Sequence, residues 1–446
     1  MIRLVTVALM AFLMGCTASP PPNIIFIMAD DLGYADAGAF GGKVISTPHL
    51  DRLAASGTRF TQVYAGSPVC APSRSTLMTG LHTGHTTVRG NFGISGGVIG
   101  LGGGKGRVPL RAEDVTVAEV LKEAGYTTGM AGKWGLGEPH TSGHPNRQGF
   151  DTWFGYLNQR RAHTYYPDYL WRDTSRVYLE GNANGGRHTY SHDRIAAFGL
   201  DFVQTYQEVP FFLYLPFTIP HAAFEVPDSS QYASQNWTPE EIAYASMVSY
   251  LDRDIGRLLD LLDALDLRRN TLIFFCSDNG AVERWEGRFD SSGPLRGRKR
   301  DLYEGGIRTP MLVSWPGMVA AGAASEAPWY FPDVLPTLAE IAKVGVSTRL
   351  DGISMLPVLK GQAHPAPERV MYWEFYERGF QQAVRWKHWK AIRLAHDAPW
   401  QLYNLTEDKG ETTNIAAEHP EILAKLIAES EKQHAPSAAW PAPIDP

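Results

Sequence analysis

Residues 23–31 read Asn-Ile-Ile-Phe-Ile-Met-Ala-Asp-Asp, an apolar run of strand length that ends in two carboxylates. A continuous apolar run is typical of a strand that is buried on both faces of a parallel sheet. The pattern returns at residues 271–277, which precede Asp278 and Asn279, and at residues 211–217, which lead to His221. In open α/β sheets, ligands bind at the carboxyl ends of the parallel strands. We therefore expect these polar side chains to form a functional site.

Helical patterns separate the predicted strands. Residues 115–124 and 240–266 carry apolar side chains at helical spacing. Strands that alternate with helices predict an α/β fold with a large, mainly parallel (mixed) sheet sandwiched by helices. We assign residues 23–350 to this domain.

The composition changes near residue 350. Short aromatic, alternating stretches follow at 370–375, 383–390 and 400–404, and a helical pattern covers 420–432. These features predict a smaller C-terminal antiparallel sheet subdomain over residues 351–433. The remaining residues 434–446 are rich in Ala and Pro, and we expect them to form a flexible tail.

The composition of the 446 residues is that of a globular protein, with 44% hydrophobic residues and a net charge of −6. This charge has the wrong sign for a general nucleic-acid-binding protein, so we expect no nucleic acid partner. Three cysteines are too few for a disulfide framework in a chain of this length. One of them, Cys276, lies in an apolar run, and we expect it in the core.

The first 16 residues have the pattern of an export signal, with Arg3 followed by an apolar run that is too short to span a bilayer. Residues 13–16, Leu-Met-Gly-Cys, resemble a bacterial lipobox, which would place a lipid on Cys16. Residues 17–22 then form a tether to the membrane. We therefore expect an exported, periplasmic protein anchored to the outer membrane, with simple secretory cleavage as the alternative.

The most specific motif is Cys-Ala-Pro-Ser-Arg-Ser-Thr-Leu-Met-Thr-Gly at residues 70–80. It resembles the signature of the type I sulfatases, the formylglycine-dependent, arylsulfatase-like family of the alkaline phosphatase superfamily. The resemblance implies that a maturation enzyme oxidises Cys70 to formylglycine (3-oxoalanine). Its hydrate is a geminal diol, in which one hydroxyl attacks sulfur and the other expels sulfate from the formylglycine-sulfate intermediate. Considered without the family, Cys70 remains open to two other interpretations, a thiol nucleophile near Arg74 or an inert buried cysteine.

Four oxygen-bearing side chains follow two of the predicted strands: Asp30, Asp31, Asp278 and Asn279. This set favours a hard divalent cation, and no cluster of Cys and His favours zinc. The resemblance implies that these residues, together with residue 70, hold Ca²⁺.

Further segments match the family in the same order along the chain. Gly132-Lys133-Trp134 resembles a motif whose lysine contacts a sulfate oxygen. Pro220-His221 and the segment that contains Lys299 resemble the groups near the leaving oxygen. Arg74, which we expect one helical turn after Cys70, can steady the charge of the nucleophile.

Gly135 departs from the family pattern, which has a histidine at this position as the base for sulfate elimination. Glycine has no group that accepts a proton. His163, in the polar and aromatic segment 156–167, is the first candidate for the missing base, and His85 is the second. A third alternative is a base that the sequence does not identify.

These patterns predict a sulfatase, a sulfuric ester hydrolase, that acts on sulfated saccharides. Aromatic residues in the segments 165–166 and 169–171 would stack on sugar rings, or else they serve packing. Aryl sulfates are the alternative substrate. The alternative functions are a formylglycine phosphodiesterase or phosphonate monoester hydrolase, and a sulfated-glycan-binding lipoprotein whose catalysis Gly135 impairs.

Overall fold

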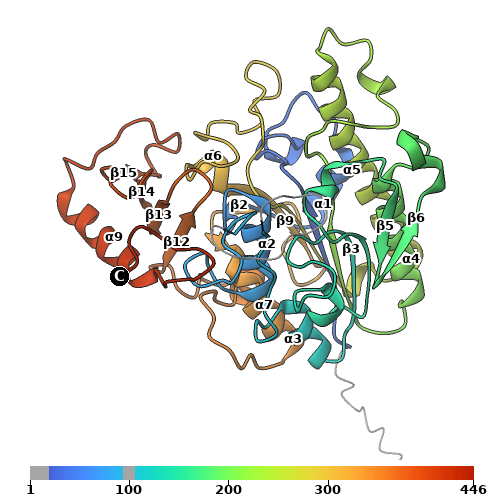
Figure 1. Ribbon diagram of the computed structural model, residues 1–446, viewed down its shortest axis with the longest axis horizontal. Coiled ribbons are helices and arrows are strands. Elements are labelled where there is room, and N and C mark those ends of the chain that lie inside the picture. The colour runs from blue at the N-terminus through green and yellow to red at the C-terminus, as the bar shows by residue number, and fades with distance from the viewer. Residues whose placement is uncertain (1–19, 94–105) are drawn as a thin grey trace, which may run out of the picture.

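A computed structural model describes residues 20–93 and 106–446 of the chain. Within these residues, an 11-stranded sheet has the strand order β10-β2-β9-β8-β1-β7-β3-β4-β5-β6, and β11 pairs with β2 (Figure 1). The expected signal peptide (residues 1–16) and residues 17–19 of the expected tether lie outside the described residues.

The strands of this sheet run in both directions, as a mixed sheet requires. Strands β8, β1, β7, β3 and β4 are parallel to one another, whereas β9 is antiparallel to both β8 and β2. The strand bounds are β1 Asn23–Ala29, β2 Thr58–Tyr64, β3 Thr127–Lys133, β4 Thr152–Tyr156, β5 Tyr169–Arg172, β6 Ser175–Tyr178, β7 Phe211–Pro216, β8 Thr271–Ser277, β9 Arg308–Ser314, β10 Ala323–Ser325 and β11 Trp329–Tyr330. The three predicted core strands are therefore confirmed as β1, β7 and β8.

Helices cover both faces of the sheet. One face packs against α1 (Pro48–Ala55), α4 (Ser191–Thr205) and α5 (Pro239–Ala264). The other packs against α2 (Cys70–Thr79), α3 (Val117–Glu123), α7 (Val334–Ala342) and α8 (Leu356–Leu359). The remaining short helices are α6 Glu304–Ile307, η1 Gly38–Phe40, η2 Pro145–Arg147, η3 Arg161–His163, η4 Glu180–Gly185, η5 Ser230–Tyr232, η6 Arg268–Asn270 and η7 Phe331–Asp333.

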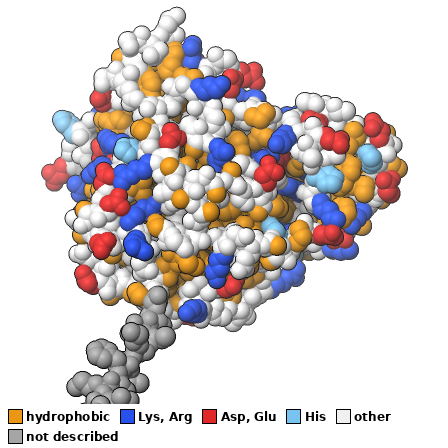
Figure 2. Space-filling model, turned by 180° about the vertical axis from the view of Figure 1, so that it is seen from behind, with side chains coloured by type: hydrophobic (Ala, Val, Ile, Leu, Met, Phe, Trp, Pro, Cys, Tyr) orange, Lys and Arg blue, Asp and Glu red, His pale blue; other side chains and the backbone are white. Residues whose placement is uncertain are grey.

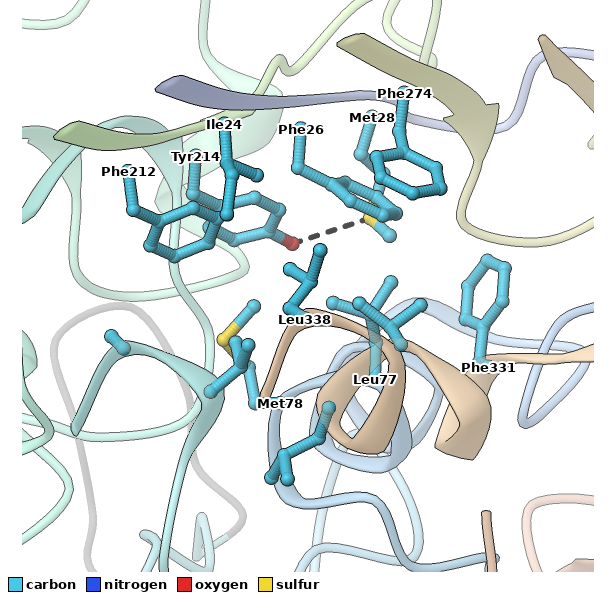
Figure 3. Close-up of a cluster of buried hydrophobic side chains, with 14 of the residues drawn as sticks. Ile24, Phe26, Met28, Leu77, Met78, Phe212, Tyr214, Phe274, Phe331 and Leu338 are labelled. Carbon is cyan, nitrogen blue, oxygen red and sulfur yellow. Dashed lines mark hydrogen bonds between the residues drawn. The ribbon is translucent and has the colours of Figure 1, made fainter. Parts of the chain in front are cut away.

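Alternating side chains of β1 separate the two cores. Ile24, Phe26 and Met28 belong to the core beneath α2 and α7, whereas the intervening residues of β1 belong to the core beneath α4 and α5. Figure 3 shows the first core, in which these side chains face Leu77 of α2 and Leu338 of α7. Cys276 is a free cysteine buried in the same core, as expected. Burial on both sides explains why the sequence of β1 is continuously apolar.

The C-terminal subdomain is a four-stranded antiparallel sheet in the order β12-β13-β14-β15. Its elements are β12 Val370–Phe375, β13 Gln381–Trp386, β14 Trp389–Arg393, β15 Gln401–Asn404 and α9 Pro420–Gln433. The expected stretch 383–390 is a hairpin rather than one strand, because the chain reverses at Lys387, which has a φ of 57°. The subdomain lies beside the large sheet (Figure 1).

Residues 434–446 differ from the flexible tail expected from their composition. The indole ring of Trp440 is 1% exposed, and its Nε1 donates to the carbonyl oxygen of Thr87 at 2.9 Å. The guanidinium of Arg89 donates to the carbonyl oxygen of Ala435 at 2.7 Å. The sequence expectation was wrong because a single buried tryptophan and a few backbone contacts hold a segment that has no regular secondary structure.

The surface shows no dominance of one charge. Lys and Arg side chains are mixed with Asp and Glu over the face in Figure 2. In the described part of the chain, none of the helices has both the length and the apolar character needed to cross a membrane.

Candidate active site

The tips of β1 and β8 bring the predicted acidic side chains together. Ala29 pairs with Ser277 at the ends of these parallel strands, so that Asp30 lies beside Asp278. The amide of Asp31 donates to Asp278 Oδ1 at 3.1 Å, and Asn279 Nδ2 donates to Asp31 Oδ1 at 2.6 Å. Asp31 has a φ of 66°, a backbone conformation that is unusual for a residue with a side chain and often marks functional sites.

Cys70 is the first residue of α2, and its thiol points into this acidic group. Its Sγ donates to Asp30 Oδ1 at 3.4 Å, and Lys299 Nζ donates to Sγ at 3.4 Å. Ligand atoms of Cys70, Asp30, Asp31 and His221 all lie within 4.8 Å of one another. The structure therefore brings together groups from β1, α2 and the loops after β7 and β8.

Arg74 lies one turn after Cys70 on α2, as expected. Its Nε and one terminal nitrogen donate to Asp278 Oδ2 at 3.1 and 2.8 Å, and the other terminal nitrogen donates to the carbonyl oxygen of Lys133 at 2.9 Å. A further contact of 3.7 Å joins Arg74 to Asp30. The guanidinium thus joins α2 to the ends of three strands.

Two buried lysines contact the aspartates. Lys133 Nζ donates to Asp30 Oδ2 at 2.7 Å, and Lys299 Nζ donates to Asp31 Oδ2 at 2.7 Å. His221 Nε2 lies 3.3 Å from Asp31 Oδ2, and the hydroxyl of Tyr165 donates to the carbonyl oxygen of His221 at 2.6 Å. The site therefore has a positive charge on each side of its carboxylates.

The two proposed replacements for the base lie in different surroundings. The ring of His163 stacks on that of His221 with a centroid separation of 3.7 Å, and its Nε2 lies 3.5 Å from Lys133 Nζ. His85 instead bonds through Nδ1 to Asp351 at 2.8 Å and stacks on His82. Of the two, the structure places His163 in the Cys70 cluster.

Burial and charge shift the ionisation of these groups. Burial alone would raise the pKa of Asp30, but the charge of Lys133, followed by His221 and Arg74, holds that pKa well below its usual range. Burial and the neighbouring Asp30 raise the pKa of Asp278 to about 6. Burial and the charge of Lys299 lower the pKa of His221 to about 4. Burial, followed by the charges of His221 and Lys133, also lowers the pKa of His163, so its ring is neutral.

The donor set fits a divalent cation such as Ca²⁺. Three carboxylates converge, and the Oδ1 of Asn279 is buried without a hydrogen-bond partner within the described residues. Such an orphaned oxygen is the kind of atom that a bound ion satisfies. Asp30, Asp31, Asp278 and Asn279 would hold the ion, and an oxygen at residue 70 would complete the set.

Two polar residues beside α2 were not predicted from the sequence. Asn91 Oδ1 accepts a hydrogen bond from the amide of Ala71 at 3.1 Å, and Gln159 Nε2 donates to the same oxygen. Gln159 stood in the polar segment 156–167, which was a usable signal, whereas nothing in the sequence around Asn91 indicated a role.

Most residues of the aromatic segments serve packing rather than a sugar platform, whereas Tyr166 and Trp171 are partly exposed. Tyr165 and Leu170 are 0% exposed and Tyr169 is 6% exposed, so their faces are not available to a ligand. Trp171 is half-buried, and its ring packs against the first core.

Two protein-family models match the chain. The protein-family model described as Sulfatase matches residues 22–344, which contain every residue of the cluster. The chain belongs to the sulfatase family. The model described as N-sulphoglucosamine sulphohydrolase, C-terminal, matches residues 297–435. This sulfatase is therefore a sulfuric ester hydrolase of the alkaline phosphatase-like superfamily.

Relatives of this sulfatase are similar over nearly the whole chain. N-acetylgalactosamine-6-sulfatase of Mus musculus is 33% identical over 92% of this chain and 80% of its own length. Arylsulfatase A of Homo sapiens is 33% identical, covering 94% of this chain and 89% of its own. The crystal structure of Ps i-CgsB in complex with k-i-k-neocarrahexaose has a TM-score of 0.83 at 31% identity, covering 95% of both chains. Phosphonate monoester hydrolase of Agrobacterium radiobacter, at 20% identity, a TM-score of 0.68 and coverage of 93% of this chain and 96% of its own, shares the fold alone.

Proposed function

We propose that this protein is an exported sulfatase that removes sulfate from sulfated glycans and uses formylglycine at position 70 beside a calcium ion. One observation carries the proposal: Cys70 Sγ lies 3.4 Å from both Asp30 Oδ1 and Lys299 Nζ, within a cluster that also holds Arg74 and Lys133. No such convergence is needed for an inert buried cysteine.

The unconverted thiol is poorly suited to be the nucleophile. Burial, followed by the charge of Asp30, raises the pKa of the Cys70 thiol above its ordinary value, so the thiolate is disfavoured. A hydrated aldehyde at this position supplies a hydroxyl nucleophile, and a bound Ca²⁺ supplies positive charge for the sulfate oxygens.

The side chains of this chain have separable roles. Lys133 and Lys299 present fixed positive charges to the sulfate oxygens, and this preorganised charge stabilises an anionic transition state. Lys299 also contacts residue 70 directly. Arg74 holds the start of α2 against the tip of β8 through Asp278. His221, together with Lys299, serves the departing oxygen.

His163 is the base in this proposal. What supports this role is its position: its ring stacks on that of His221, and its Nε2 lies 3.5 Å from Lys133 Nζ, inside the Cys70 cluster. We expect His163→Ala to lower kcat by about 10²- to 10⁴-fold, the usual contribution of a general base. His85→Ala is the comparison, and wild-type turnover in both variants would exclude both histidines.

Sulfated saccharides are the proposed substrates because two of the similar proteins are named for a saccharide or hold one. The similar solved structure contains a neocarrahexaose, and a relative is an N-acetylgalactosamine-6-sulfatase. We expect higher kcat/KM on defined sulfated oligosaccharides than on aryl sulfates, which are the alternative substrate. A screen of both substrate classes with one enzyme preparation makes the comparison.

Mass spectrometry of the peptide that contains residue 70 tests the chemistry. Protein made together with a formylglycine-generating enzyme should carry the aldehyde and hydrolyse sulfate esters faster than aryl phosphodiesters. A thiol in protein from the native host would contradict the enzyme and favour a sulfated-glycan-binding lipoprotein. Faster phosphodiester cleavage would favour the phosphodiesterase or phosphonate hydrolase.

Export and anchoring rest on the sequence of residues 1–16 alone. The test is Cys16→Ala: the protein should move from the outer-membrane fraction to the soluble periplasmic fraction. If the wild-type protein is already soluble, secretory cleavage without a lipid is the correct interpretation.

A further inference from the structure

Gln159 occupies the space that a side chain at position 135 would enter. Gly135 has a φ of 80°, and a Cβ built on it would lie 2.9 Å from Gln159 Oε1. Gln159 follows β4 and is 4% exposed. Gly135 comes two residues after Lys133, whose ammonium contacts Asp30. The amide of Gln159 therefore lies at the wall of the Cys70 cluster.

The hydrogen bonds fix which end of the Gln159 amide faces which neighbour. Asn91 accepts from the backbone N–H of Ala71, so the atom that Asn91 presents there must be its oxygen. The same oxygen meets Gln159, which must therefore present its NH₂ group. The Oε1 of Gln159 is left on the other side of the amide. It is buried, and it has no hydrogen-bond partner within the described residues.

A buried amide oxygen without a donor is unfavourable, which indicates that a donor is present in the working protein. The oxygen has no contact with bulk solvent, so its donor is a buried water or a buried group of the protein. The Cys70 thiol is already engaged with Asp30 and Lys299. A hydrated aldehyde at residue 70 adds a second hydroxyl that cysteine does not have, and the neighbouring Ala71 is bonded to the Asn91–Gln159 pair.

We propose that Gln159 is a positioning residue for residue 70: its Oε1 accepts a hydrogen bond from the hydroxyl that the hydrated aldehyde has and cysteine lacks. This inference rests on the proposed conversion of Cys70. Hydration adds water across the carbonyl, so that the water oxygen bonds to carbon and a water proton passes to the former carbonyl oxygen. By holding one of the two hydroxyls, Gln159 favours the hydrate over the free aldehyde and orients that hydroxyl for loss of its proton.

The test measures the free aldehyde chemically, apart from turnover. Only the free aldehyde reacts with hydroxylamine, and mass spectrometry of the residue-70 peptide counts the oxime that forms. The test uses the purified full-length protein carrying the aldehyde. We expect Gln159→Leu and Gln159→Met to react about 3- to 10-fold faster than wild type, because losing one hydrogen bond to the hydrate raises the amount of free aldehyde by about this factor.

Gln148 provides a matched control. It is a fully buried glutamine whose Nε2 donates to the carbonyl oxygens of Arg111 and Ser142, and its Oε1 also has no partner within the described residues. Gln148→Leu removes a buried amide away from the Cys70 cluster, so its oxime should form at the wild-type rate. If Gln148→Leu accelerated oxime formation as much as Gln159→Leu, the cause would be a general loss of packing in the protein. That result would overturn the inference.

Kinetics give the second readout. Losing orientation of the second hydroxyl should lower kcat of Gln159→Met and leave kcat/KM for a sulfate ester within about 2-fold, because the first displacement at sulfur does not need that hydroxyl. Wild-type oxime formation and wild-type kcat in both Gln159→Met and Gln159→Leu would overturn the role of Gln159. An absence of aldehyde in mature wild-type protein would instead contradict the proposed function itself.

Discussion

Gly135 illustrates at the scale of one residue how a departure from the family pattern is accommodated. Its φ of 80° lies in the left-handed region, where a Cβ is strained, and the nearest neighbour of that Cβ would be Gln159 Oε1. A side chain cannot simply be added at this position, because both the backbone and the occupied space oppose it.

The first prediction concerns this backbone conformation. Gly135→Ala should lower the free energy of unfolding by about 1–2 kcal/mol, measured by urea denaturation, because alanine pays the left-handed penalty. Gly135→Asn is the control, since asparagine tolerates this region better and should cost less despite its larger side chain. An alanine variant as stable as wild type would contradict the assigned φ.

At the scale of elements, a buried ion network joins α6 to the C-terminal sheet. Lys390 of β14 is 0% exposed and lies 2.9 Å from carboxylates of both Glu304 and Glu411. Burial and the charge of Glu304 raise the pKa of Glu411 to about 7, although Lys390 opposes this. One ammonium thus contacts two acidic side chains at the contact between the subdomains.

Removing this ammonium is the second prediction. Lys390→Met should lower the free energy of unfolding by about 3–5 kcal/mol, because it leaves the buried Glu411 without a counter-charge, whereas Glu304 keeps its ion pair with Arg308. Lys387→Met, on the same hairpin, breaks an exposed pair with Glu368 and should cost less than about 1 kcal/mol. Urea denaturation of the three proteins makes the comparison, and equal costs would show that the network is not stabilising.

A third prediction follows from His434, just after α9. Its Nδ1 lies 2.5 Å from Glu374 and its Nε2 lies 2.7 Å from Asp445. Burial alone would lower the pKa of His434, but the bonds and charges of these carboxylates raise it above its ordinary value near 6.5. The folded state therefore holds the proton more tightly than the unfolded chain. The stability contributed by His434 is full below pH 6.5 and is lost as the pH rises through the raised pKa.

The measurement is the melting temperature as a function of pH. The difference in melting temperature between wild type and His434→Gln should be largest below pH 6.5 and shrink at higher pH. Phe380 stacks edge-on against the imidazole and is unchanged by the substitution, so packing is largely kept. A difference independent of pH would contradict the ionic role of His434.

The elements also show what the sequence could predict and why. The apolar runs of β1, β7 and β8 identified the core strands, and the residues after β1 and β8 met as expected because parallel neighbours end at one edge. The hairpin at Lys387 was missed because its turn has no Gly or Pro. Asn91 and Gln159 were missed because their importance arises from a contact between distant segments, which no local pattern records.

At the scale of the whole molecule, the end of the chain returns to the catalytic domain. Trp440 packs with Tyr376 and Phe380 of the C-terminal subdomain, and its ring would lie 2.7 Å from a Cβ at Gly90. The same residue donates to Thr87, shortly after α2. This contact ties both subdomains together beside the helix that carries Cys70.

The fourth prediction is cooperative unfolding of the two subdomains. Calorimetry of the wild-type protein should show one transition, and Trp440→Ala should lower the free energy of unfolding by about 3–5 kcal/mol through the cavity that it leaves. Ile444→Ala, in the same segment but at a side chain that is 37% exposed, should change it by about 0.5 kcal/mol or less. Two separate transitions in wild type would show that the subdomains fold independently.

The burial of Cys70 also has a consequence for the timing of its proposed oxidation. In the finished fold this side chain is 1% exposed, so an oxidising enzyme must reach it before the surrounding strands assemble. Strand β8, which completes the acidic side of the pocket, begins at Thr271, roughly 200 residues after Cys70 leaves the ribosome. At 5–20 residues per second, synthesis leaves a window of about 10–40 s in which the cysteine is still open to modification. The order of strands along the chain thus keeps the nucleophile accessible during synthesis and closes it off afterwards.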